Sequence, residues 1–513
     1  MNSVTAIRGE LLAAVRAHAL RRPAAIALEG PQSALSYREL ERAIGDLGAE
    51  LRRHGSRRVA LLADNGMAWA LAELACLDAG LLCVPLPSFF SPGQIVHALR
   101  SAGIDTLLVD PRLSLPSPLF DAPSVPLDAL PVLAGVLHRV RLPTPPAITG
   151  LHAGTCKITF TSGTTGEPKG VCLGIEEQQS VAAALLGASG ADEDARHLCV
   201  LPLSTLLENI GGLYAPLLAG ATTCVWPLAD VGLSGASALN VHKLLEAIIT
   251  ARASSVILVP QMLLALVSAI EAGAPRPVSL RFIAVGGASV SPALLQRAIA
   301  LGLPVFEGYG LSECASVVAL NRADAQRPDT VGKPLPHVQI SIAGDGEILV
   351  TGSSFRGYVG EAPRDRGQAV ATGDIGYLDS DGFLHITGRK KNIFVTSFGR
   401  NVSPDWVERE LCLHPAIAQA AVFGEAAPFN VAVIVARAPG IDAAIAAVNR
   451  ELPDYARIRK WIAASAPFTP ANDQGTANSR LRRAQIRAAY ASQIESLYQD
   501  PPRSIQGSEA APA

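Results

Sequence analysis

Two long stretches of the chain alternate short apolar runs with helical patterns. In the first stretch the runs Arg58–Leu62, Leu82–Leu86 and Thr106–Val109 are interleaved with helical patterns such as Met67–Asp78. This alternation predicts parallel strands joined by crossover helices. The strand candidates of the second stretch are apolar enough to be buried on both faces of a sheet. They are Lys157–Thr161, Ser255–Val259, Arg281–Val285 and Pro304–Glu307. The predicted fold class is therefore α/β.

The length and texture of the chain predict more than one domain. A chain of 513 residues exceeds what one core usually organises. Residues 111–146 are rich in proline and lack periodicity, which is typical of a connecting segment. After about Thr387 the elements become shorter and the helices between them more charged. We expect a large N-terminal domain of mixed α/β subdomains over residues 1–387, a small mobile α+β domain over 388–499 and a disordered tail over 500–513.

The composition excludes several classes of protein. Apolar residues make up 49% of the chain and charged residues 17%, as in globular proteins. A net charge of -2 without a long basic cluster argues against nucleic acid as the main partner. The apolar stretch Val256–Ile270 is interrupted by Pro260 and too short for a membrane span, so it predicts a buried strand followed by a helix.

The N-terminus and the cysteines indicate a compartment. Residues 1–18 read as an amphipathic helix and lack the uninterrupted apolar core of a signal peptide. The 8 cysteines are scattered, without a Cys-x-x-Cys pair. We therefore expect a cytoplasmic protein.

A loop rich in glycine and hydroxyl groups follows the strand candidate that begins at Lys157. Its glycines permit close approach of the backbone, its N–H groups and hydroxyls donate hydrogen bonds, and its lysine supplies positive charge, as a polyphosphate requires. It lacks the Gly-Lys-Ser/Thr triplet of a Walker loop. A flexible surface turn is the alternative interpretation. The loop runs from Thr161 to Gly170 and contains Ser162, Gly163, Thr164, Thr165, Gly166 and Lys169.

This string resembles the phosphate loop of the adenylate-forming superfamily, which includes acyl-CoA synthetases, peptide-synthetase adenylation domains and firefly luciferase. Three further segments resemble motifs of that superfamily, in the same order. Gly308–Glu313 is similar to its G-Y-G-x-T-E segment, Thr372–Asp374 to its T-G-D motif and Gly388–Asn392 to its G-R-x-x-D/K motif. The resemblance extends from Leu35 to about Ile486, nearly the whole chain.

The resemblance implies a role for each matching residue. Glu313 would hold Mg²⁺ through oxygen ligation, and Asp374 would accept hydrogen bonds from the ribose hydroxyls. The alternatives are a salt-bridged loop carboxylate for Glu313, an interdomain ion pair for Asp374 with Arg389, and simple packing for Tyr309. The residues implied in ATP or AMP binding are Thr161, Ser162, Gly163, Thr164, Thr165, Gly166, Lys169, Gly287, Gly308, Tyr309, Gly310, Ser312, Asp374 and Arg389.

The C-terminal part departs from the superfamily pattern at one position. The catalytic lysine of the superfamily lies in a motif such as L-T-x-T-x-K-x-x-R, and the similar segment Thr476–Arg483 has Arg480 at that place. Arginine keeps the charge but presents a planar fork where lysine has a compact ammonium. The resemblance implies that Arg480, Ser312 and Lys169 are catalytic; a solvated basic helix is the alternative for Arg480. It also implies a hinge at Lys391 and a thiol approach along Gly399 and Arg400.

The predicted activity is the activation of a carboxylic acid by ATP to an acyl-adenylate, with Mg²⁺, followed by transfer to the thiol of coenzyme A. Leu201–Glu208 resembles the L-P-L-S-H-x-x-E segment of long-chain acyl-CoA synthetases, although Thr205 replaces the histidine. A fatty or other apolar acid is therefore favoured, with a structural strand end as the alternative for this segment. Two other functions stay open: transfer to the phosphopantetheine of an acyl carrier protein, and a non-catalytic protein that binds acyl-AMP or ATP.

Overall fold

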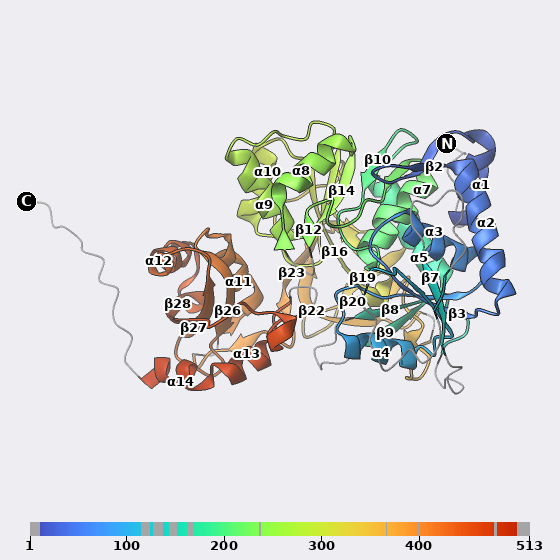
Figure 1. The fold of residues 1–513 in the computed structure, drawn as a ribbon. Coiled ribbons are helices and arrows are strands. Elements are labelled where there is room, and N and C mark those ends of the chain that lie inside the picture. Colours follow the sequence, from blue (N-terminus) through green and yellow to red (C-terminus); the bar gives the residue numbers. More distant parts are fainter. Residues whose placement is uncertain are drawn as a thin grey trace, which may run out of the picture. The chain divides into compact units, whose positions relative to one another are not determined.

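The computed structural model describes residues 11–113, 124–126, 137–142, 151–161, 168–234, 238–365, 367–398, 400–476 and 480–499. The chain divides into two compact units, which Figure 1 colours along the sequence. The first unit extends to Thr372 and includes Gly376–Ile386, and the second consists of Gly373–Ile375 and the chain from Thr387 onwards. In the part of the chain that is described, no helix is both long and apolar enough to cross a membrane.

A nine-stranded sheet of the first unit contains the predicted parallel strands. Its order is β18-β17-β16-β15-β14-β10-β11-β1-β2, and the six strands from β16 to β1 are parallel to their neighbours. The antiparallel β17 and β18 close one edge and β2 the other. The bounds are β1 Ile26–Glu29, β2 Ala34–Ser36, β10 Arg196–Leu198, β11 Thr222–Cys224, β14 Ser255–Leu258, β15 Phe282–Val285, β16 Val305–Leu311, β17 Ser316–Leu320 and β18 Lys333–Pro334.

An eight-stranded sheet contains the other predicted strands, in the order β21-β9-β8-β4-β3-β5-β7-β6. Its centre is parallel, and β9 returns antiparallel beside β8. The prediction of a connecting segment over residues 111–146 was wrong for part of it, because β6 and β7 pair antiparallel beside β5 and satisfy its outer backbone groups. The bounds are β3 Arg58–Leu62, β4 Leu82–Pro85, β5 Thr106–Val109, β6 Ser124–Pro126, β7 His138–Arg141, β8 Lys157–Thr161, β9 Lys169–Leu173 and β21 Gly357–Tyr358.

The helices of the first unit pack around its main hydrophobic core. Helix α2 begins at a capping box of Ser36 and Glu39 and packs against α1 and α3, as Figure 1 shows. Trp69 and Tyr37 are among the largest buried side chains there. The bounds are α1 Leu11–Arg21, α2 Tyr37–Arg53, α3 Met67–Asp78, α4 Pro92–Ser101, α5 Ile175–Ser189, α6 Leu206–Glu208, the π-helix η2 Asn209–Tyr214, α7 Ala215–Ala219, α8 Val241–Thr250, α9 Pro260–Glu271, α10 Pro292–Ala300 and the 3₁₀-helix η3 Ser312–Cys314.

Two further, smaller sheets are formed by strands in the part of the chain that ends at Arg389. The pair β12 (Leu233–Ser234) and β13 (Ala238–Leu239) is antiparallel. The four-stranded sheet has the order β19-β20-β22-β23. Its bounds are β19 Val338–Ile342, β20 Glu347–Gly352, β22 Val370–Leu378 and β23 Leu384–Arg389.

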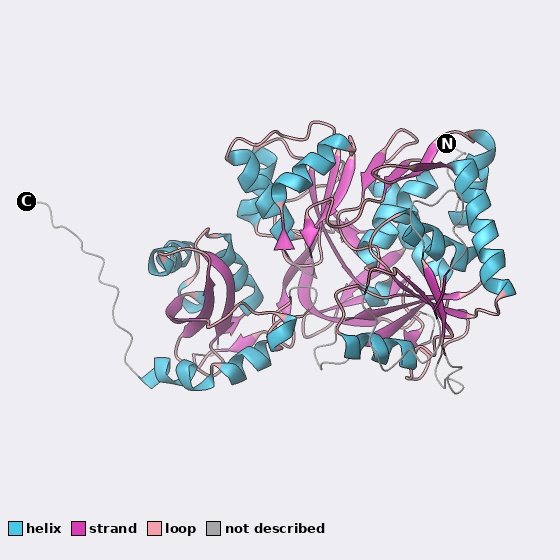
Figure 2. Cartoon of the chain, in the orientation of Figure 1, coloured by secondary structure: helices cyan, strands magenta, loops and turns pink. Residues whose placement is uncertain are grey.

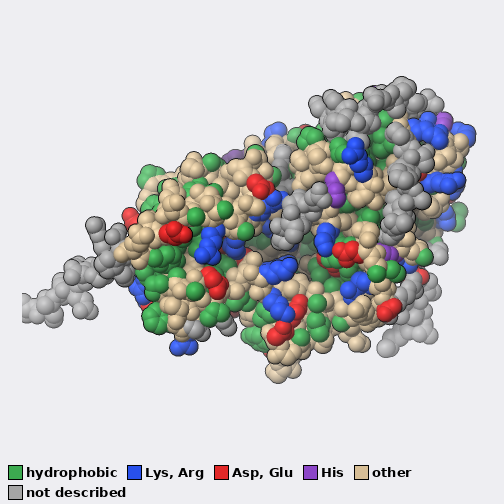
Figure 3. All heavy atoms as spheres, turned by 90° about the horizontal axis from the view of Figure 1, so that it is seen from below, with side chains coloured by type: hydrophobic (Ala, Val, Ile, Leu, Met, Phe, Trp, Pro, Cys, Tyr) green, Lys and Arg blue, Asp and Glu red, His purple; other side chains and the backbone are tan. Residues whose placement is uncertain are grey.

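On the face of the molecule seen in Figure 3, basic and acidic side chains lie among one another, in keeping with a net charge of -2.

The second unit is a three-stranded sheet with helices on both faces (Figure 2). Side chains of the central strand β27 alternate between two cores, one with α11 and α12 and the other with α13 and α14. This agrees with the predicted α+β character. The bounds are β24 Phe394–Val395, β25 Asn401–Val402, α11 Pro404–Leu413, β26 Ile417–Phe423, β27 Asn430–Ala436, α12 Ile441–Glu451, η4 Asp454–Ala456, β28 Ile458–Ala463, η5 Pro470–Asn472, α13 Arg483–Ala489 and α14 Ala491–Gln499.

Candidate active site

The Gly308–Glu313 segment continues strand β16 and turns sharply at its end. A Cβ at Gly310 would lie 1.9 Å from the carbonyl oxygen of Ser316, so glycine is required where β16 and β17 approach. Directly after this segment, Ala315 and Ser316 have φ values of 58° and 125°. Such conformations cost non-glycine residues about 1–3 kcal/mol each and concentrate at functional sites. The strained residues therefore follow directly after the 3₁₀-turn that contains Ser312 and Glu313.

The carboxylate of Glu313 is oriented by a tyrosine. The hydroxyl of Tyr358 donates to Glu313 Oε1 over 2.7 Å, and the backbone N–H of Phe355 donates to the Glu313 carbonyl over 2.7 Å. Burial, and next the Glu313 carboxylate, raise the pKa of Tyr358 above its usual value, which keeps the phenol a donor. A partly buried carboxylate with one oxygen bound by a phenol retains the lone pairs that a hard cation such as Mg²⁺ takes.

The ends of the phosphate loop are held by the β8–β9 hairpin. Thr161 is the last residue of β8 and pairs with Lys169, the first residue of β9. Lys169 Nζ lies 3.1 Å from Glu361 Oε1 and 4.8 Å from the centre of the Tyr358 ring. Tyr358 therefore contacts both Lys169 and Glu313. Ser162, Gly163, Thr164, Thr165 and Gly166 lie outside the described residues.

Two further predicted positions, Gly287 after strand β15 and Gly308 within strand β16, lie on neighbouring strands. Gly286 and Gly287 follow β15, and a Cβ at Gly286 would lie 3.2 Å from the Gly308 carbonyl oxygen. Ligands of parallel α/β sheets bind at the carboxyl ends of the strands. Tyr309 is partly buried and packs against the main core, so its described surroundings agree with the packing alternative; stacking on adenine stays a prediction.

The second unit holds Asp374 and Arg389 as an ion pair. Arg389 Nε lies 2.7 Å from Asp374 Oδ1, and the aspartate side chain is 5% exposed against 44% for the arginine. The backbone N–H of Lys390 donates to the Gly373 carbonyl over 2.8 Å and fixes the two segments side by side. The acceptor that is predicted to face the ribose is therefore already oriented by a guanidinium.

The predicted hinge residue Lys391 and the predicted thiol residue Arg400 lie before and after strand β24 in the sequence. Lys391 is exposed in a turn where the N–H groups of Asn392 and Ile393 both donate to the Arg389 carbonyl over 2.9 Å. The Thr396 N–H donates to the Arg400 carbonyl over 3.0 Å, and the Arg400 N–H donates to Thr396 Oγ1 over 3.2 Å. Gly399 is outside the described residues. The roles of Lys391, Gly399 and Arg400 stay predictions.

Arg480 is an exposed residue that pairs with Thr476 before helix α13. Its N–H donates to Thr476 Oγ1 over 3.0 Å, and its carbonyl accepts from the Thr476 N–H over 2.7 Å. Next to this pair, Gly475 and Leu481 form an antiparallel bridge. The alternative interpretation placed Arg480 within a solvated basic helix, but helix α13 begins only at Arg483. The backbone of Arg480 is thus held by its hydrogen bonds to Thr476 and by the neighbouring Gly475–Leu481 bridge.

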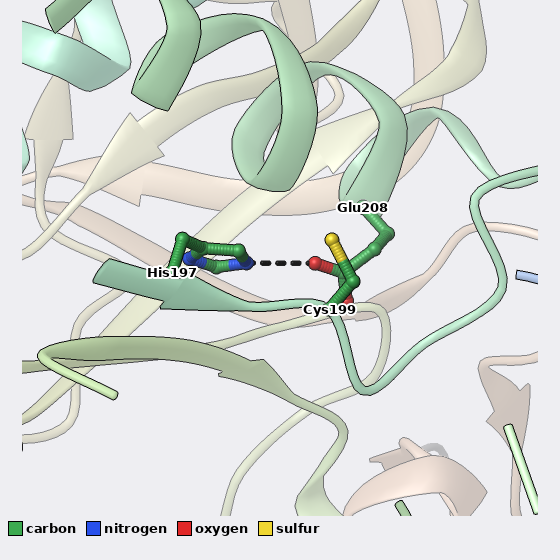
Figure 4. A group of neighbouring side chains, drawn as sticks. All are labelled: His197, Cys199 and Glu208. Carbon is green, nitrogen blue, oxygen red and sulfur yellow. Dashed lines mark hydrogen bonds and ion pairs between the residues drawn. The ribbon is translucent and has the colours of Figure 1, made fainter. Parts of the chain in front are cut away.

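Among the described residues, one group of three metal-ligating side chains comes together, and Figure 4 shows it: His197, Cys199 and Glu208. His197 Nε2 lies 2.8 Å from Glu208 Oε1, and the other carboxylate oxygen accepts from the Leu201 N–H over 2.8 Å. A Cβ at Gly212 would lie 2.1 Å from Glu208 Oε1, which shows how tightly the group is packed. Glu208 therefore has a structural role, and we assign no ion to this group.

One buried ion pair was not predicted from the sequence. Lys157 Nζ lies 2.6 Å from Glu73 Oε1 and 3.1 Å from the Tyr214 hydroxyl, and the two charged side chains are 2% and 1% exposed. The signal was available: Lys157 opens an otherwise apolar strand and Glu73 interrupts the apolar helix α3. Tyr358 and the helix α11 carboxylates had no comparable signal.

The family of the chain follows from sequence comparison. The sequence model of the AMP-binding enzyme family matches residues 15–361, and that of the AMP-binding enzyme C-terminal domain matches residues 391–501. The chain therefore belongs to the AMP-binding enzyme family, and the predicted membership of the adenylate-forming superfamily is confirmed.

Three known proteins illustrate the similarity. The long-chain-fatty-acid–CoA ligase FadD15 of Mycobacterium tuberculosis is 36% identical over 248 residues, 42% of this chain and only 41% of that relative. The feruloyl-CoA synthase of an Amycolatopsis species is 30% identical over 423 residues, 78% of this chain and 83% of that relative. A solved structure of Bacillus subtilis O-succinylbenzoate coenzyme A synthetase with ATP and magnesium has a TM-score of 0.74 at 24% identity, covering 92% and 99% of the two chains; it confirms the mixed α/β fold with a large N-terminal and a small C-terminal part.

Proposed function

We propose that the chain is an AMP-forming ligase that joins a carboxylic acid to the thiol of coenzyme A. In the first step a carboxylate oxygen attacks the α-phosphorus of ATP, the bond to the β-phosphate oxygen breaks, and pyrophosphate leaves. In the second step the thiol sulfur attacks the carbonyl carbon of the acyl-adenylate, the bond to the AMP oxygen breaks, and AMP leaves. Membership of the AMP-binding enzyme family over both of its sequence models is the observation that carries this proposal.

The contacts of the candidate residues support the first step. Lys169 and the loop hydroxyls are suited to bind the phosphates, and Ser312 keeps the hydroxyl that donates to the α-phosphate. Mg²⁺ held by Glu313 would neutralise the charge that spreads over the phosphates during transfer. Asp374, oriented by Arg389, is suited to accept hydrogen bonds from ribose hydroxyls. The proposal therefore gives a role to each polar group described around these segments.

We propose a fatty acid as the first candidate substrate. The similarity of Leu201–Glu208 to the long-chain segment and the 36% identity to a long-chain-fatty-acid–CoA ligase support it. An aromatic acid is the second candidate, because the feruloyl-CoA synthase is matched over a much larger share of its length.

One screen tests the activity and the substrate class together. Purified protein with ATP and Mg²⁺ is given saturated fatty acids of several chain lengths and, separately, hydroxycinnamic acids, and AMP release is measured with and without coenzyme A. We expect acid-dependent AMP release that coenzyme A accelerates, strongest with fatty acids. Release of ADP would contradict the proposal, and a preference for the aromatic acids would select the second candidate.

The thiol acceptor is tested separately. Replacing coenzyme A by a phosphopantetheinylated acyl carrier protein distinguishes the two acceptors, because the acyl-loaded carrier is detected by its mass. We expect thioester formation with coenzyme A and none with the carrier protein.

A non-catalytic binding protein is the alternative that Arg480 permits. Binding of ATP in calorimetry without acid-dependent pyrophosphate exchange would support that alternative. We expect exchange, because arginine retains the positive charge on a backbone that is hydrogen-bonded to Thr476. An engineered Arg480→Lys that activates a silent wild type would show that the arginine abolished adenylation.

A further inference from the structure

The Arg480 loop and the hinge turn of the second unit are connected by charged side chains of helix α11. Asp405 lies in the first turn of this helix, and Glu408 follows on its buried face. Asn392, from the turn that contains Lys391, donates through Nδ2 to Asp405 Oδ2 over 3.0 Å. Arg483, three residues after Arg480, binds the other oxygen of the same carboxylate through Nη2. Asp405 therefore accepts from both segments at once.

The arginine end of this connection is firmly held. Arg483 also binds Glu408, with Nη1 on Oε1 and with Nη2 2.7 Å from Oε2. The Glu408 carboxylate accepts a further bond from the Val422 N–H over 2.7 Å, which anchors it to strand β26. The Arg483 and Glu408 side chains are only 16% and 9% exposed. Paired, forked hydrogen bonds of this kind fix geometry as well as charge.

The other end of the connection reaches the predicted ribose residues. Asn392 belongs to the turn that hydrogen-bonds back to the Arg389 carbonyl, and Arg389 is paired with Asp374. Contacts therefore run without a break from Asp374 through Arg389, Asn392 and Asp405 to Arg483. Every one of these contacts is within the second unit.

We propose that Asp405 is a positioning residue that holds the Arg480 loop and the Arg389–Asn392 turn as one rigid assembly, so that the loop moves with the hinge. This inference rests on the proposed function and on two roles that the resemblance implies, a hinge at Lys391 and the participation of Arg480 in adenylation. Asp405 itself contacts no reacting atom in this scheme. It acts by fixing the distance between the turn and the loop base.

The rigidity is tested by hydrogen exchange in the free protein, which needs no substrate. The amides of Thr476 and Arg482 report the loop base, and the amides of Asn392 and Ile393 report the turn, because each donates a backbone hydrogen bond. In Asp405→Asn we expect both sets to exchange about tenfold faster, since one neutral amide cannot serve both donors.

The matched control is Asp442→Asn. Asp442 also lies in the first turn of a helix of the second unit and accepts a side-chain bond, from Trp461 over 2.7 Å, but it contacts neither segment. We expect the four amides to be unchanged in this variant. Equal exchange in Asp405→Asn and Asp442→Asn, or faster exchange of only one set in Asp405→Asn, would overturn the proposal.

The functional consequence is tested by a double-mutant cycle. Asn392→Ala removes the turn end of the connection and leaves Arg483 on Glu408. We expect it to lower the kcat of acid-dependent pyrophosphate exchange about fivefold at unchanged KM for ATP, and to have no further effect in an Arg480→Ala background. Additive effects would show that Asn392 does not act through Arg480. If wild type itself shows no pyrophosphate exchange, the proposed function fails, while the hydrogen-exchange result still decides on the rigid assembly.

Discussion

At the scale of single residues, the site is defined as much by its supporting contacts as by its motif. Glu313 was identifiable because it ends a segment with a recognisable spacing. Tyr358 was not, because it lies 45 positions further along the chain on a two-residue strand. Only the pairing of β21 with β9 brings its ring beneath Lys169 and its hydroxyl to Glu313. Motifs therefore predicted the groups that would meet ATP, and the fold supplied the group that orients them.

Removal of the Tyr358 hydroxyl is expected to weaken the binding of Mg²⁺ by Glu313. Tyr358→Phe keeps the ring beneath Lys169 but deletes the bond to Glu313. A hydrogen bond to a charged group contributes about 1.5–3 kcal/mol, and the partial exposure of this pair places it at the low end. We expect adenylation to fall about tenfold and the Mg²⁺ concentration for half-maximal rate to rise. Tyr377→Phe, at a half-exposed tyrosine, is the control. An unchanged Mg²⁺ dependence in Tyr358→Phe would contradict the assignment of Glu313.

At the scale of elements, strand β8 and helix α3 are locked by the Lys157–Glu73 pair. Lys157→Met leaves the Glu73 carboxylate buried without its cation, and such a loss costs about 3–5 kcal/mol. We expect a fall of that size in the free energy of unfolding of the first unit, measured by urea denaturation. The double variant Glu73→Gln with Lys157→Met should recover most of it. A loss below about 1 kcal/mol in the single variant would show that the pair is solvated in the folded protein.

Helix α11 should make the stability of the second unit depend on pH. Burial raises the pKa of Glu408 to about 7; Arg483 lowers this pKa, and the Asp405 carboxylate raises it. Burial and the Glu408 carboxylate in turn raise the pKa of the Cys412 thiol. A carboxyl whose pKa is higher in the folded state stabilises that state below about pH 4.5, and this contribution is lost as pH rises to about 7.

The prediction is made relative to a variant that cannot ionise. From pH 5 to pH 8, wild type should lose about 1–3 kcal/mol of opening free energy at the β27 amides relative to Glu408→Gln. Hydrogen exchange, corrected for its intrinsic pH dependence, measures this difference. A constant difference across that range would show that Glu408 stays ionised in its pair with Arg483.

Helices and strands could be predicted where their own residues determine the structure, and were missed where contacts with distant residues determine it. Helix Met67–Asp78 and strands Arg58–Leu62, Thr106–Val109 and Lys157–Thr161 were predicted with their observed bounds, because buried parallel strands and their helices have continuous apolar patterns. The strand His138–Arg141 was missed, since Val140 is its one apolar residue and the strand is defined only by pairing with β5. The resemblance at Gly308–Leu311 gave no sign that these residues continue strand β16.

At the scale of the whole molecule, the two units have separate cores and should respond separately to substitution. Lys157→Met acts in the main core of the first unit, and Glu408→Gln acts between α11, α13 and β26 of the second. We therefore expect Lys157→Met to lower protection of β8 amides while β27 amides keep their opening free energies, measured by hydrogen exchange on one sample. Parallel loss of protection in both strands would mean that the units unfold as a single cooperative body.

The path of the chain has a consequence for recombination between relatives. The backbone enters the second unit for Gly373–Ile375, returns to the first for Gly376–Ile386, and leaves again at Thr387. A chimera joined at Thr387 therefore takes Arg389 from one parent and Asp374 from the other, although the two side chains form one pair. Exchange of specificity between members of this family would keep that pair from one parent only if the crossover point lies before Asp374 or after Arg389.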